Sequence, residues 1–197
     1  MQCAPGLYFG VNIGTSPSGK APGFGPGIRG FESLRPSQAR YIFINKTPVW
    51  VLFDIIRHME TKKQILDFIN EHPLMVISTL NKGGKSESAV VGFGQTGNFE
   101  LIFGTDIGTR KAQNILSNGD VSVVIGWDGG GTVQYEGVAR RLEGEESDRY
   151  SEIYFQKVPK SRRHKDVKGE TYFLIEPKWL RLTEVAFEPW KITELKF

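Results

Sequence analysis

The chain has 197 residues, of which 39% are hydrophobic, and this is enough for one domain with a substantial core. It carries 25 Lys and Arg residues against 22 Asp and Glu residues, and the small formal net charge of +3 does not predict nucleic acid as a partner. The single cysteine, Cys3, excludes a disulfide framework and a cysteine-based zinc site.

The longest apolar stretch, residues 41–56, is interrupted by Asn45, Lys46, Pro48 and Asp54. It does not predict a membrane span, which needs about 20 uncharged residues. No Lys or Arg precedes Lys20, so the positive flank of a secretory signal is also missing. We therefore expect a cytoplasmic protein with no membrane partner.

The composition of the chain changes near Met59. Residues 1–58 hold 8 of the 23 glycines and 6 of the 10 prolines, and their six basic and two acidic residues give a charge of +4. Residues 59–197 hold the other 19 basic and 20 acidic residues, a net charge of −1. The basic character belongs to the leader, so we expect no basic binding face on the folded part.

Residues 1–58 show no sustained periodicity of either 2 or 3.6 residues. One interpretation is a disordered native tail or a transit segment. Another is that the leader is spurious, because codons for Gly30-Phe31-Glu32-Ser33 resemble the T-arm of a transfer RNA gene and those for residues 36–38 can contain its CCA end. Our hypothesis is an over-extended reading frame, with the working domain at 59–197 starting at Met59.

The remaining residues predict strands joined by short turns, with three helices among them. Apolar spacing and Pro73 predict an amphipathic helix over 60–72, and further helices are predicted over 111–118 and 143–159. Strands are predicted over 74–80, 86–93, 99–105, 121–127, 132–142, 169–183 and 189–197. We predict a mainly β fold, an antiparallel barrel with peripheral helices.

The sharpest local pattern is residues 103–111, Phe-Gly-Thr-Asp-Ile-Gly-Thr-Arg-Lys, in which a strand end, a turn and a helix start follow one another. Free N–H groups at a helix N-terminus favour an anion, and Thr105, Thr109, Arg110 and Lys111 add hydroxyl donors and charge. They suit a phosphomonoester. The alternative is a helix capped by Thr109 with two solvated basic residues, although basic residues in a first turn oppose the helix dipole.

Two further patterns are compatible with a planar ligand. Trp127 precedes three glycines, 129–131, which let a backbone approach a ring or simply form a flexible hairpin. Trp179 and Arg181 are two residues apart, on one face of a strand, where they suit either a ring system with an anion or an ordinary surface pair.

Catalytic side chains are not evident. The three histidines have no metal-ligand spacing, and no Gly-x-Ser-x-Gly nucleophile elbow occurs. Since no nucleophile or acid–base pair stands out, any chemistry would have to come from a cofactor.

Five motifs in order resemble the FMN-binding split barrels related to pyridoxamine 5′-phosphate oxidase, over about residues 59–195. They are the Asn-Lys-Gly-Gly-Lys turn after strand 74–80, the Phe-Gly-Thr…Gly-Thr-Arg-Lys-Ala stretch, Asn118-Gly119-Asp120 before a valine-rich strand, the Gly-Val-Ala-Arg-Arg-Leu of 137–142, and the Pro-Lys-Trp-Leu-Arg of 177–181.

The resemblance implies a homodimer with two FMN molecules in grooves between the subunits. It implies that Thr105, Thr109, Arg110 and Lys111, in the turn that begins at Gly104, hold the phosphate. The backbone of the strand with Ala89, Val90, Val91 and Gly92 would follow the isoalloxazine edge. Thr132, Trp179 and Arg181 would reach the flavin from the partner subunit.

Two departures argue against the vitamin B6 oxidase itself. Ala89 and Gly94 stand where that enzyme has an arginine and a lysine, and residues 187–191 replace its Arg-Leu-His-Asp-Arg substrate motif. We expect an FMN-dependent oxidoreductase acting on an unidentified small substrate. The alternatives are a non-catalytic flavin or haem carrier or sensor, a deazaflavin-dependent reductase and, least favoured, a purely structural interaction domain.

Overall fold

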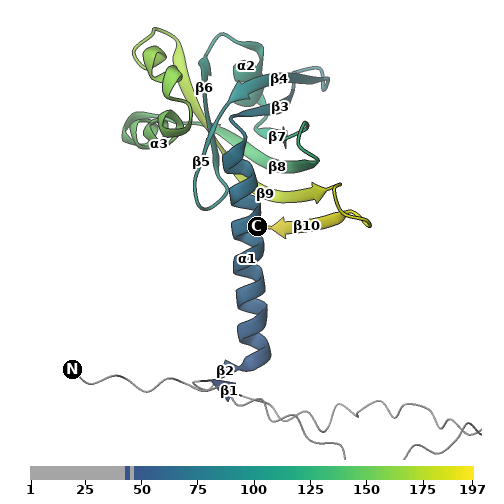
Figure 1. Cartoon of the computed structure of the whole chain (residues 1–197). Helices are drawn as coiled ribbons and strands as arrows, with labels where there is room; N and C mark the ends of the chain where they lie inside the picture. The colour runs from purple at the N-terminus through teal and green to yellow at the C-terminus, as the bar shows by residue number, and fades with distance from the viewer. Residues whose placement is uncertain (1–42, 45–46) are drawn as a thin grey trace, which may run out of the picture. The chain divides into compact units, whose positions relative to one another are not determined.

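The structure is a computed structural model that describes residues 43–44 and 47–197 (Figure 1). Most of the predicted leader, 1–58, lies outside these residues, so the reading-frame hypothesis stays a prediction. The first described elements are two paired strands, β1 (Phe43–Ile44) and β2 (Thr47–Pro48). They lead directly into the first helix.

The rest of the domain is built on one antiparallel sheet that curls into a half-barrel (Figure 1). Its strands lie in the order β4-β3-β7-β8-β9-β6-β5, and β10 pairs with β9. Their bounds are β3 Leu74–Leu80, β4 Ser86–Gly92, β5 Gly94–Gln95, β6 Leu101–Asp106, β7 Asp120–Ile125, β8 Gly131–Arg141, β9 Glu170–Glu184 and β10 Lys191–Lys196. This architecture confirms the predicted mainly β split-barrel fold.

Helices flank the sheet and join its strands. They are α1 (Val49–Glu71), α2 (Arg110–Ser117), α3 (Gly144–Lys157) and a 3-10 turn at Pro159–His164. None of the described helices is long and apolar enough to cross a membrane. The second and third helices match their predicted positions to within a few residues.

The first helix is longer than its predicted range of 60–72. It begins at Val49 because no glycine or proline interrupts the chain between Pro48 and Pro73, so nothing in the sequence ends the helix near Met59. The two ends of the helix differ in burial. Ile65 and Ile69 are buried in the core, whereas Phe53 and Met59 are largely exposed.

The core has two parts. The larger fills the half-barrel, where alternate residues of β3, β7 and β8 point inward against Ile65 and Ile69 of α1. The smaller lies where α3 covers the outer face of β6 and β9, and it contains Ile102, Leu142, Tyr154, Phe155, Tyr172 and Leu174. Because β9 is covered on both faces here, residues 171–175 are all buried and their sequence does not alternate.

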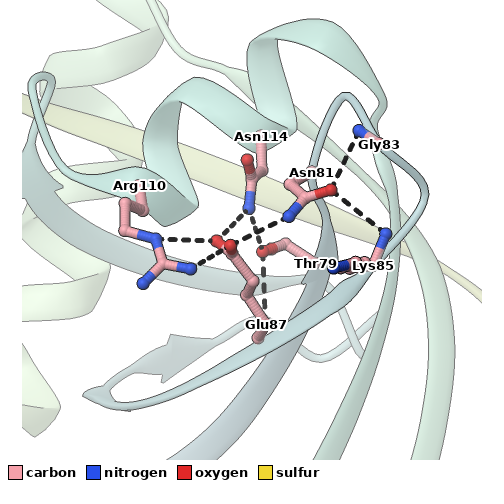
Figure 2. A network of polar contacts seen from close by, with 7 residues as sticks. All are labelled: Thr79, Asn81, Gly83, Lys85, Glu87, Arg110 and Asn114. Atoms are coloured by element: carbon pink, nitrogen blue, oxygen red, sulfur yellow. Dashed lines mark hydrogen bonds and ion pairs between the residues drawn. The ribbon is translucent and has the colours of Figure 1, made fainter.

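Strand β4 is the end strand of the sheet. It pairs with β3 along its whole length, from Leu74 opposite Gly92 to Leu80 opposite Ser86, and no other described strand pairs with it. Its outer backbone edge is therefore open. Helix α2 packs against β3 and β4, so its N-terminal end comes close to this open edge (Figure 2).

Candidate functional site

A groove of about 340 Å³ separates β4 from the first turn of α2. Its lining residues come from β3 and β4 on one side and from the start of α2 on the other: Thr79, Glu87, Ser88, Ala89, Thr109, Arg110 and Lys111. The first N–H groups of a helix have no partner within the helix, so one wall presents donors as well as two cations. The groove has the character of an anion site.

The turn before α2 is held by its own side chains. The Asp106 carboxylate accepts a hydrogen bond from the backbone N–H of Gly108 at 2.7 Å, and the Thr109 hydroxyl donates to the Asp106 carbonyl at 2.8 Å. Thr109 is the residue that precedes the helix, but its side chain does not cap the helix N–H groups. The first N–H groups of α2 are therefore not capped by this side chain.

The predicted phosphate residues separate into two sets. Thr109, Arg110 and Lys111 line the groove, whereas Thr105 is buried on β6 with its hydroxyl 3.2 Å from that of Thr109. Gly104 lies further back, where an added Cβ would stand 2.9 Å from the Tyr172 ring. Packing against Tyr172 is enough to require glycine at that position.

Lys111 is a partly desolvated cation. Burial lowers the pKa of its ammonium group, and the charge of Glu170 acts in the opposite direction. A phosphate in the groove would compensate this lost hydration directly. Arg110 differs, because it already has a carboxylate partner within the chain.

The residues predicted on β4 point to both faces of the strand. Ala89 is half-buried and lines the groove, whereas Val90 is 59% exposed and Val91 is buried in the core. Gly92 ends the strand against Val158. The predicted contact was with the backbone of this strand, and that edge is unpaired among the described strands.

Thr132, Trp179 and Arg181 do not line this groove. They lie on β8 and β9, where the Arg181 guanidinium stands 5.4 Å from the centre of the Trp179 ring and donates from Nε to Glu194 at 2.7 Å. Within one chain, these three residues therefore lie apart from the groove residues at the start of α2. Their predicted approach from a second subunit is compatible with this separation.

The glycine run after Trp127 forms a hairpin between β7 and β8. Trp127 is 53% exposed, and an added Cβ at Gly129 or Gly130 would meet nothing within 4 Å. Gly130 has a φ of +77°, a conformation that glycine adopts without strain. The ordinary hairpin interpretation accounts for these residues.

Glu87, at the centre of the groove, was not among the site residues predicted from the sequence. Figure 2 shows its carboxylate between Arg110, Asn81 and Asn114. Asn81 Nδ2 donates to Oε1 at 3.0 Å, Asn114 Nδ2 donates to Oε2 at 2.9 Å, and Arg110 donates to both oxygens, from Nε to Oε2 at 3.1 Å and from Nη2 to Oε1. Arg110, Asn81 and Asn114 lower the pKa of Glu87 to about 2, so it is an anion at neutral pH.

Further polar contacts, some of them buried, hold the residues of this network in place. Asn114 is buried and also donates to the Thr79 hydroxyl at 3.0 Å, and Thr79 in turn donates to the backbone carbonyl of Glu87 at 3.3 Å. The Asn81 side chain accepts from the backbone N–H groups of Gly83 and Lys85 in the β3–β4 turn (Figure 2). The groove walls are therefore linked through Glu87.

The outer face of the sheet carries a row of valines. Val90, Val76 and Val124 are register partners across β4, β3 and β7, and all three are at least partly exposed. A second hollow of about 280 Å³ lies beside them, with Ser78, Ser122 and Glu136 among its lining residues. Among the described residues no cluster of three or more His, Cys, Asp or Glu is placed to hold a metal ion.

Comparison with known proteins identifies the family. Residues 61–184 match the family described as pyridoxamine 5′-phosphate oxidase, and the chain belongs to that family. The match extends from α1 to the end of β9 and includes all the residues that line the groove. No match was found among the curated proteins.

Solved structures of the same fold have different descriptions. A putative pyridoxamine 5′-phosphate oxidase from Listeria innocua has a TM-score of 0.53 and 20% identity, over 61% of this chain and 96% of its own. A haem-binding protein from Mycobacterium smegmatis has a TM-score of 0.58 and 15% identity, over 70% and 56%. Campylobacter jejuni ChuZ has a TM-score of 0.60 and 14% identity, over 70% and 60%. The chain spans less than two thirds of the last two, and these likenesses establish the fold alone.

Proposed function

We propose that this protein is a homodimeric, cytoplasmic FMN-dependent oxidoreductase that acts on a small molecule other than the vitamin B6 substrate. The observation that carries the proposal is the groove between the open edge of β4 and the first turn of α2. It combines the start of α2, with Lys111 and Arg110, on one wall with the unpaired outer edge of β4 on the other. Family membership adds to this, since proteins of the family commonly bind flavin.

The residues of the groove fit the phosphate end of FMN. The Lys111 ammonium supplies a positive charge that burial has partly stripped of water, and the Thr109 hydroxyl lies beside it in the lining. Arg110 keeps its Nη1 nitrogen free of hydrogen bonds to any described residue. A bound flavin would supply the hydride or electron transfer, while these residues would bind and orient it.

The row of valines on the outer face of the sheet, called the valine stripe below, is the observation that supports a dimer. Val76, Val90 and Val124 form an apolar stripe on the outer face of the sheet, where Val90 is 59% exposed, and a second copy would bury it. In that arrangement Thr132, Trp179 and Arg181 of one subunit are available to complete the groove of the other. The homodimer is therefore part of the proposal.

A non-catalytic haem carrier is the second candidate, favoured by the fold shared with the Mycobacterium smegmatis haem-binding protein. The lining of the groove argues for FMN instead, because it contains no His, Cys, Met or Tyr, the usual ligands of haem iron. A deazaflavin remains the third candidate, since its phosphate would use the same donors.

The deciding experiment is a titration of the purified protein with FMN, deazaflavin cofactor and haemin, followed by absorbance and thermal shift. We expect FMN to raise the melting temperature most, because a ligand that binds only the folded state stabilises it. Reduction of the bound flavin by NADH or NADPH, with reoxidation by a defined acceptor, separates an enzyme from a carrier. A protein that does not bind FMN and is stabilised by haemin alone would contradict the proposal.

A further inference from the structure

We infer that Glu87 is a positioning residue of the proposed FMN site, which holds the Arg110 guanidinium side-on and leaves its Nη1 edge for the ligand phosphate. The inference rests on the proposed function and deepens it, because it assigns the residue that prepares the phosphate anchor.

The Glu87 carboxylate is fully used. A carboxylate has about four acceptor positions, and four donated hydrogen bonds reach it from Asn81, Asn114 and two nitrogens of Arg110. These donors come from the β3–β4 turn and from α2 (Figure 2). The carboxylate is therefore a fixed part of the groove and ties the two walls together.

The Arg110 side chain, in contrast, is exposed. Its relative exposure is 80%, against 19% for Glu87. An exposed arginine normally loses considerable side-chain entropy when it binds a ligand. Glu87 already holds Nε and Nη2 in the free protein, so the side chain of Arg110 loses less entropy when a ligand binds. The guanidinium can still donate from Nη1.

An opposite role for Glu87 would be to compete with phosphate for Arg110. Displacing the carboxylate from Arg110 by rotation would also withdraw it from Asn81 and from buried Asn114, and a buried donor left without a partner is destabilising. The network thus favours a carboxylate that stays in place while the ligand binds beside it. The two roles predict opposite effects of removing Glu87.

The test compares FMN with riboflavin, which lacks the phosphate, in the wild type, E87Q, R110A and the E87Q/R110A double variant. Gln keeps the size of Glu but presents its amide N–H groups to donors, so the side-on pair is lost. We expect E87Q to weaken FMN binding about tenfold or more, with riboflavin affinity unchanged. In the R110A background E87Q should have little further effect on FMN binding.

The matched control is E146Q, which removes a carboxylate that pairs with Arg140 at 2.6 Å and does not line the groove. It should leave the affinities for both flavins unchanged, and thermal melts report whether each variant is folded. Unchanged or tighter FMN binding by E87Q, or additive effects in the double variant, would overturn the inference while wild-type FMN binding stands. If the wild type itself does not bind FMN, the proposed function fails and the inference fails with it.

Discussion

At the scale of single residues, the site is built from a short local pattern and from contacts across the sequence. The 103–111 pattern predicted the start of α2 to within one residue, because strand ends, turns and caps are encoded locally, and three of its residues line the groove. Glu87 was not predicted, because the residues that donate hydrogen bonds to its carboxylate lie 6, 23 and 27 positions away in the sequence. In an alternating strand with an exposed serine on either side, it resembles any solvated glutamate.

Lys111→Ala tests the phosphate anchor most simply. We expect FMN affinity to fall about 10- to 100-fold, because a hydrogen bond to a charged group contributes about 1.5–3 kcal/mol. Isothermal titration measures the effect. Riboflavin affinity should not change, and Lys160→Ala, at an exposed lysine outside the groove, is the control. An equal loss for both flavins would instead mean that Lys111 supports the fold.

At the scale of elements, strands were the easiest part to predict. The range predicted for β3 was correct, because Pro73 and the Asn81 turn mark its two ends. The two-residue strand β5 was missed, since two residues carry no period. The start of α1 was predicted too late because the composition of the chain changes near Met59. Helix propensity does not change there, and the helix begins at Val49.

Gly137→Ala tests the junction between β8 and β9. The register of these strands shifts between Glu136 and Gly137, and an added Cβ at Gly137 would clash with the carbonyl oxygen of Glu176. The backbone has to move, so we expect the free energy of unfolding to fall by about 1–3 kcal/mol in urea denaturation. Gly97→Ala, where a Cβ meets nothing within 4 Å, should change it by less than about 0.5 kcal/mol. Equal effects at the two sites would contradict the packing account.

Lys157 on α3 connects three elements. Its Nζ donates to the Ile69 carbonyl at 2.6 Å and to the Gln95 side chain at 2.7 Å, and it lies 3.8 Å from the centre of the Phe93 ring. It forms no ion pair with a carboxylate among the described residues. Burial lowers the pKa of this ammonium group from 10.5 to about 7.

This shift predicts a pH dependence of stability. Between pH 7 and pH 10.5 the unfolded chain binds a proton at Lys157 that the folded protein does not, so the free energy of unfolding from this group rises with pH. Below pH 7 both states are charged and that gain is absent. Urea midpoints at pH 7 and 9.5 should rise less in Lys157→Met than in the wild type, with Lys160→Met as control. A wild-type rise equal to that of Lys157→Met would contradict the lowered pKa.

At the scale of the whole molecule, the fold and the family could be predicted from motifs that occur in a fixed order along the sequence, whereas the oligomeric state could not. A single sequence shows which strand residues face outward but not what covers them. The valine stripe became visible only when the register aligned Val90 with Val76 and Val124. The partner-side roles of Thr132, Trp179 and Arg181 accordingly remain proposals.

Val76→Glu tests the dimer. A carboxylate in the middle of the stripe would be buried without a partner in a symmetric interface, so we expect a monomer by light scattering where the wild type is a dimer. FMN affinity should fall with it, because the partner residues are lost. Val167→Glu, at a 53% exposed position outside the stripe, should stay dimeric. A monomeric wild type would contradict this assembly.

The most direct measurement is a crystal structure of the protein grown with FMN. We predict that the flavin phosphate lies in the groove between β4 and α2, within hydrogen-bonding distance of Lys111 Nζ and Arg110 Nη1, with the Glu87–Arg110 pair intact. A phosphate bound elsewhere, or crystals without flavin at saturating FMN, would contradict it.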